Sequence, residues 1–185
     1  LSRNLNASIK PEWTDKLKSK CFHDAVKEYE RYLDNMKINI QEAKVHPNDD
    51  EQFLDVKYSS IAGQLGYMAA MILVDGFVAK YPLKLLRFKP PGSTATNSSE
   101  QEKRQKFMNE GLNGLSAYNT LLKMNFPPQI NKSFNSVHSS LHIDVHYTQS
   151  SQIDTYNAGL VDLESFANYF ISEAKKKLKS AGVIT

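Results

Sequence analysis

The spacing of apolar residues, which repeats in steps of four and three along most of the chain, constrains the fold more than any other feature. Near the start these residues are Phe22, Val26, Tyr29, Leu33, Met36, Ile40 and Ala43. Such steps place side chains on one face of an α-helix, because about 3.6 residues complete a turn. The pattern predicts a long amphipathic helix from about Pro11 to Val45, ended by His46 and Pro47.

A second predicted helix follows Pro47 and is the most apolar of the chain. Asn48 is a suitable N-cap, and Glu51 three residues later completes an approximate capping box. The apolar surface then widens from Ile61 onward, so we expect this helix to be central, and Pro82 ends it. Three glycines lower its helix propensity but allow a neighbouring helix to approach closely. They are Gly63, Gly66 and Gly76.

Three more helices are predicted in the second half of the chain. They cover about 99–124, about 130–147 and about 156–174, and a flexible loop at 89–99 precedes them. No segment alternates as a half-buried strand would. Long amphipathic helices joined by short turns favour antiparallel neighbours. The predicted fold class is therefore all-α: an up-and-down helical bundle of four to five helices, formed by residues 1–185 as a single domain.

Composition and motifs exclude several function classes. The net charge of +3 is too small to indicate a nucleic-acid-binding face, and the single cysteine, Cys21, excludes an intrachain disulfide. The stretch from Met68 to Ala79 is too short for a membrane span, and the first residues do not resemble a signal peptide. Phosphate-binding glycine loops, nucleophile elbows and HExxH motifs are absent. We therefore expect a cytoplasmic protein with no cofactor and no membrane contact.

The histidine row, which we define as His138, His142 and His146, is the arrangement that stands out. Residues four apart lie along one helical face, and imidazoles on adjacent turns can share a divalent metal. The structural alternative, which we prefer, is the polar face of a helix whose other face is apolar. Asp144 is close in sequence but points to a different side. The apolar face would be Val137, Leu141 and Val145.

One carboxylate lies in the most apolar predicted helix. Asp75 at such a position should be paired or hydrogen-bonded, or should have a raised pKa. Pairing within the bundle is the default expectation, and a functional acid is the alternative.

Two stretches of sequence together resemble the HEPN family, whose name stands for higher eukaryote and prokaryote nucleotide-binding. The first runs from Asp55 through Leu65-Gly-Tyr-Met-Ala-Ala70 and is similar to the family's second helix. The second runs from Phe134 to Tyr147 and is similar to its later helices. The likeness covers most of the chain as an order of elements and implies a helical bundle. It also makes Tyr147 a further candidate site residue.

HEPN members that cut RNA share an Arg, four to six residues, then His motif, paired across a dimer in a metal-independent site. Here Lys132, five residues, then His138 is the matching arrangement, and lysine lacks the planar fork of arginine. The resemblance therefore favours a non-catalytic binding module that forms a homodimer or joins a protein partner, for example a nucleotidyltransferase-like one. A toxin-like ribonuclease acting on RNA through Lys132 and His138, and a metal-binding bundle using the histidine row, are the alternatives.

Overall fold

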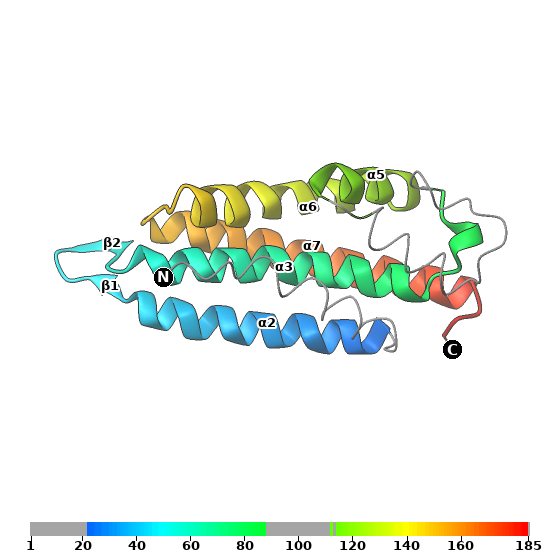
Figure 1. Cartoon of the computed structure of the whole chain (residues 1–185), viewed down its shortest axis with the longest axis horizontal. Coiled ribbons are helices and arrows are strands. Elements are labelled where there is room, and N and C mark those ends of the chain that lie inside the picture. Colours follow the sequence, from blue (N-terminus) through cyan, green and yellow to red (C-terminus); the bar gives the residue numbers. More distant parts are fainter. Residues whose placement is uncertain (1–21, 88–111, 113, 185) are drawn as a thin grey trace.

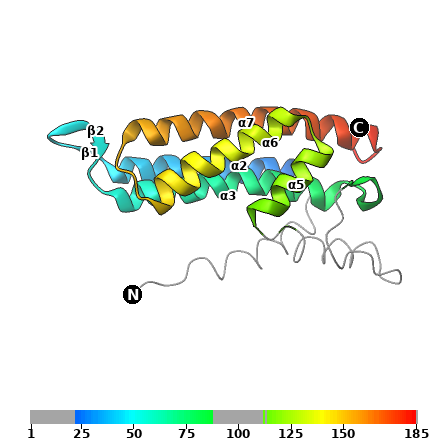
Figure 2. The same cartoon turned by 90° about the horizontal axis from the view of Figure 1, so that it is seen from above.

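Long helices that run in alternating directions make up most of the computed structural model, which describes residues 22–87, 112 and 114–184. They lie side by side, as Figures 1 and 2 show. The predicted all-α class is confirmed in its predominantly helical content. In chain order the helices are α2 (Phe22–Ala43), α3 (Val56–Lys80), the 3-10 helix η1 (Leu83–Leu85), α5 (Leu115–Asn125), α6 (Pro128–Val137), the π-helix η3 (His138–Tyr147) and α7 (Ile153–Ser180).

The predicted helix bounds agree with the structure only in part. α2 ends at Ala43 rather than at Val45, and the expected start near Pro11 lies outside the described residues. The third predicted helix is described only as α5, while its expected first part and the 89–99 loop also lie outside them. The fourth predicted helix is real but changes its winding at His138, where α6 gives way to η3.

Helix α3 is central, as expected, and packs against α2, α6, η3 and α7. Its glycines lie where neighbouring helices come closest. A Cβ added at Gly76 would be 2.2 Å from the Cβ of Ala25 on α2, and one added at Gly63 would be 2.6 Å from the backbone oxygen of Leu141 on η3. The expectation that these glycines permit close helix approach is confirmed, since any larger residue would push the helices apart.

A β-hairpin that the apolar pattern did not predict lies between α2 and α3. Strand β1 (Val45–His46) pairs antiparallel with β2 (Asp49–Phe53), and the hairpin projects beyond the ends of the helices (Figure 1). The predicted cap at Asn48 and Glu51 is therefore wrong, because Asn48 lies in the turn and Glu51 in β2. The prediction of no strand failed because β2 buries only Phe53 and so has no apolar alternation.

Phe53 fastens the hairpin to the bundle. Its N–H donates to the carbonyl oxygen of Ser151 at 2.8 Å, and its ring meets that of Tyr156 edge-on, with centroids 6.0 Å apart. The true N-cap of α3 is Asp55, whose carboxylate accepts a hydrogen bond from the Lys57 N–H at 3.0 Å.

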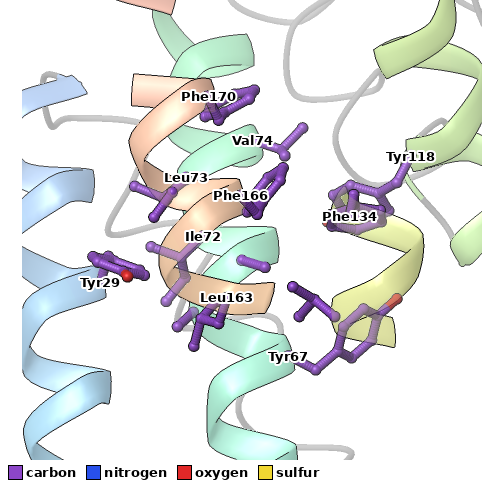
Figure 3. Packing of buried hydrophobic residues seen from close by; sticks show 14 of the residues in the cluster. Tyr29, Tyr67, Ile72, Leu73, Val74, Tyr118, Phe134, Leu163, Phe166 and Phe170 are labelled. Carbon is purple, nitrogen blue, oxygen red and sulfur yellow. The ribbon is translucent and has the colours of Figure 1, made fainter. Parts of the chain in front are cut away.

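Aromatic side chains from several helices fill the core, where α3 and α7 face α6 (Figure 3). Phe166 and Phe170 on α7 stack with centroids 5.4 Å apart, and Phe134 on α6 lies 5.4 Å from Phe166. All three side chains are fully buried. Offset and tilted ring pairs of this kind stabilise a core beyond their buried area.

Among the helices in the described ranges, only α3 has the length and apolar composition that crossing a membrane requires. Its 25 residues exceed the apolar stretch that the sequence suggested. Two-thirds of its apolar window (67%) is buried inside the bundle, as is usual for a core helix. The apolar character of α3 is thus accounted for by packing against its four neighbouring helical segments.

Candidate functional site

The histidine row lies along η3, beside α3. Its three side chains are half-buried, while the apolar side chains expected on the other face are fully buried. These are Val137, Leu141 and Val145. The expectation of an apolar and a polar face is therefore confirmed, but the polar face contacts α3 and is not simply solvated.

Winding and close packing together position the histidine row. In η3 each backbone N–H reaches five residues back, as the Thr148 N–H does to Ile143 O at 2.9 Å, so a turn holds more residues than in an α-helix. Residues four apart are therefore slightly less than one full turn apart and still share one face of η3. The Leu141 side chain fits against two glycines, since a Cβ at Gly66 or Gly159 would lie 2.6 or 2.4 Å from its methyl carbons.

His146 is bonded to the second turn of α3. Its Nδ1 lies 3.1 Å from the carbonyl oxygen of Ser60, and only an N–H can face a carbonyl at that distance. The Ser60 hydroxyl in turn donates to the backbone oxygen of His146 at 3.1 Å. These reciprocal contacts join η3 to α3.

His142 is the most enclosed member of the histidine row. Its Nδ1 lies 2.9 Å from the side-chain oxygen of Gln64, and its ring stacks on that of Tyr67 with centroids 4.4 Å apart. Burial, and then the neighbouring His138 and His146, lowers the pKa of His142 to about 4. The ring is therefore neutral at pH 7 and donates to Gln64 through Nδ1.

His138 has more freedom than the other two. Its ring meets the edge of Tyr67 at 5.3 Å and lies 5.2 Å from the ring of His142. No hydrogen bond joins it to any other residue that the structure describes. Burial lowers the pKa of His138 below its ordinary 6.5, which favours the neutral ring with a lone pair on one nitrogen and a hydrogen on the other.

The side chain of Lys132 does not lie beside that of His138. Its side chain is exposed on α6, and within the described part of the chain no contact joins it to His138. Positions six apart on an α-helix point about 120° away from each other. One copy of the chain thus leaves the two candidate ribonuclease residues on different sides.

Asp75 takes part in an interhelical hydrogen bond. The hydroxyl of Tyr118 on α5 donates to its carboxylate at 2.7 Å, which confirms the expected pairing. Burial, and then the charge of Asp75, raises the pKa of Tyr67 to about 12, and the same causes raise the pKa of Tyr118 well above 10.0. Tyr67 thus lies between the Asp75–Tyr118 pair and the histidine row, since its ring also contacts those of His138 and His142.

The remaining candidates are on the surface at the end of η3. Asp144 has an exposed side chain, and its backbone oxygen accepts from the Ser150 N–H at 3.1 Å. Tyr147 is 63% exposed, and its ring edge packs on His142 and His146 with centroids 4.8 and 5.1 Å away. Tyr147 thus covers one end of the histidine row, while Asp144 points elsewhere, as expected.

Sequence reasoning missed the partners of the histidine row on α3, namely Ser60, Gln64 and Tyr67. A signal was present, because these residues are four and three apart and share one face of a helix whose close approach was predicted from its glycines. Among the described residues, no group of three or more His, Cys, Asp or Glu is arranged to hold a metal ion. The three histidines therefore do not converge on one point in this arrangement.

A helical bundle with a half-buried row of imidazoles between two helices is the class of protein that these observations define. The chain matches no known family model and no curated protein. Among solved structures it is similar to a protein of unknown function from Dyadobacter fermentans, with a TM-score of 0.59 and 19% sequence identity over 85% of this chain and 99% of the other. At that identity the likeness shows a shared fold alone.

Proposed function

We propose that the chain is a HEPN-like, non-catalytic helical bundle that acts as a binding or interaction module. The observation that carries the proposal is the way the candidate catalytic groups are used. Asp75, His142 and His146 each form hydrogen bonds between helices, and Lys132 is turned away from His138. Each of these bonds joins two helices, so the hydrogen-bonding atoms that a catalytic role would use are already engaged within the fold.

The proposed partner is a second copy of the chain or another protein, with a nucleotidyltransferase-like protein suggested by the family resemblance. Exposed apolar side chains on η3 and on α7 support protein association. They include Ile143 and Tyr147 on η3 and Val161 and Tyr169 on α7. A cytoplasmic location belongs to the same proposal.

Light scattering coupled to gel filtration tests the association, using protein without a histidine tag at several concentrations. A homodimer gives twice the 21.0 kDa mass of one chain. A mass that stays at one chain at every concentration would count against the homodimer and leave a different protein as the partner.

An RNA cleavage assay with chelator present tests the absence of catalysis. We expect no cleavage by the wild type or by His138→Ala. One observation favours the ribonuclease alternative: the ring of His138 forms no hydrogen bond with any residue that the structure describes. Cleavage by the wild type that disappears in His138→Ala and in Lys132→Ala would replace our proposal with a metal-independent ribonuclease whose site forms across two copies.

A further inference from the structure

We propose that His138 and His142 form a binding site for a divalent transition-metal ion such as Zn²⁺ on the face of η3 that borders α3. The inference goes beyond the proposed interaction module and does not depend on it. It rests on the hydrogen-bond partners of the two rings, on their spacing and tilt, and on the kind of donor atoms that they offer.

The hydrogen bond that His142 makes through Nδ1 leaves its Nε2 free to bind a metal ion. Because Nδ1 donates to the oxygen of Gln64 on α3 at 2.9 Å, the lone pair of the neutral ring is on Nε2, the nitrogen that does not face Gln64. Metal-binding histidines usually donate their other ring N–H in this way, and the bond fixes the tautomer and the ring orientation. Gln64 thus prepares His142 for metal binding without itself touching the ion.

The spacing of the two rings suits a shared ion. The ring centres are 5.2 Å apart and the ring planes are tilted by 50°. With a metal–nitrogen distance of about 2 Å, an ion lies roughly 3 Å from each ring centre, so two rings at a tetrahedral angle have centres roughly 5 Å apart. The ring of His138 forms no hydrogen bond with the described residues, so it can adjust its tilt toward the ion.

His146 is excluded from this site by its orientation. Its ring is inclined by only 19° to that of His142, at 5.6 Å, and its Nδ1 faces the backbone of Ser60. A metal binds in the plane of an imidazole, and nearly parallel planes do not meet close to both rings. The geometry therefore selects two members of the histidine row, in agreement with the absence of a three-residue group in the described part of the chain.

The donor atoms determine the class of ion. Two neutral imidazole nitrogens suit Zn²⁺, Ni²⁺ or Cu²⁺, whereas Mg²⁺ and Ca²⁺ prefer oxygen ligands. The half-exposed position of both rings leaves the other coordination positions to water. Such a site binds the ion without building it into the core.

The test is a calorimetric titration of the full chain, without a histidine tag and stripped with chelator, with Zn²⁺ and separately with Mg²⁺. We expect one Zn²⁺ per chain, at least tenfold weaker binding in His138→Ala and His142→Ala, and no measurable Mg²⁺ binding. Gln64→Leu should weaken Zn²⁺ binding by about 10-fold or more, because second-shell partners of histidine ligands have effects of that size. His23→Ala, an exposed histidine on α2, is the matched control and should bind as the wild type does.

Several outcomes would overturn the site. These are no Zn²⁺ binding by the wild type up to millimolar concentration, unchanged binding in His138→Ala, or a loss in His146→Ala as large as that in His142→Ala. Circular dichroism checks that each variant folds. If His142→Ala fails to fold, His138→Ala still decides the question, because its side chain is half-exposed and holds no hydrogen bond among the described residues.

Discussion

At the scale of single residues, several polar side chains of this bundle have hydrogen-bond partners on neighbouring helices. Asn119 accepts a bond from Asn131 at 2.6 Å and donates to Asn135 at 2.8 Å, which joins α5 to α6. Within the described ranges, no buried side-chain nitrogen or oxygen lacks a partner. Burying an unpaired polar group costs more than a hydrogen bond gains, so each such group requires a specific partner.

Tyr118→Phe should lower the free energy of unfolding by about 1–3 kcal/mol, because it removes the hydroxyl that donates to the carboxylate of Asp75. Urea denaturation measures the change. Tyr169→Phe is the matched control, since Tyr169 is 56% exposed and its loss of a hydroxyl should change stability by less than about 0.5 kcal/mol. Equal effects of the two substitutions would show that the bond to Asp75 does not stabilise the fold.

At the scale of elements, close approach between helices decides which residues can meet. Glycines on α3 and α7 let the backbone and Leu141 of η3 come within contact distance, and this brings His142 and His146 within hydrogen-bond reach of α3. On the other side of α3, Gly76 lets α2 approach through Ala25. Small residues thus set the distances at which the polar partners form their bonds.

Gly76→Ala should destabilise the protein by about 1–2 kcal/mol, although alanine is the better helix former by about 1 kcal/mol. The added Cβ would be 2.2 Å from that of Ala25, and so short a contact places the cost of overpacking at about 2–3 kcal/mol, from which the propensity gain of about 1 kcal/mol is subtracted. When Ala25 is first replaced by glycine, the added Cβ at position 76 no longer meets another Cβ. Gly76→Ala should therefore lower the free energy of unfolding much less in Ala25→Gly than it does in the wild type. Additive effects in this double-mutant cycle would contradict the close approach.

At the scale of the whole molecule, buried tyrosines distributed over the bundle link its stability to alkaline pH. Burial is the main cause that raises the pKa of Tyr29 on α2, of Tyr67 on α3 and of Tyr156 on α7, in each case to about 12. Their ordinary pKa is 10.0. Folding therefore favours the neutral phenol at three places that different helices supply.

The free energy of unfolding should be independent of these tyrosines below pH 10 and should fall as the pH rises from 10 to 12. The sign follows because the unfolded chain loses the phenol protons near pH 10, whereas the folded chain holds them until about pH 12. Urea denaturation at stepped pH values, with absorbance of tyrosinate as a second signal, measures the effect. Tyr156→Phe should make the decline shallower, and a decline parallel to that of the wild type would exclude Tyr156 as a contributor.

Much of the fold could be predicted because helix periodicity is a local property of the sequence. The α2 stripe, the central position of α3, the apolar face of η3 and the last helix all follow from residues three and four apart. The hairpin could not be predicted in this way. Its strands are held by backbone bonds, including one to distant Ser151, and a backbone bond leaves little trace in side-chain patterns.

The candidate site, like the fold, could be predicted from the sequence only in part. The sequence by itself determined that the histidine row lies on one face of a helix, that Asp75 needs a partner, and that glycines on α3 admit a neighbouring helix. Only the tertiary structure decided that Gln64 and Ser60 are the partners of His142 and His146, and that Tyr118 is the partner of Asp75. The reason is physical: spacing along a helix fixes which side chains share a face, whereas the partner across a helix contact depends on how two distant segments pack.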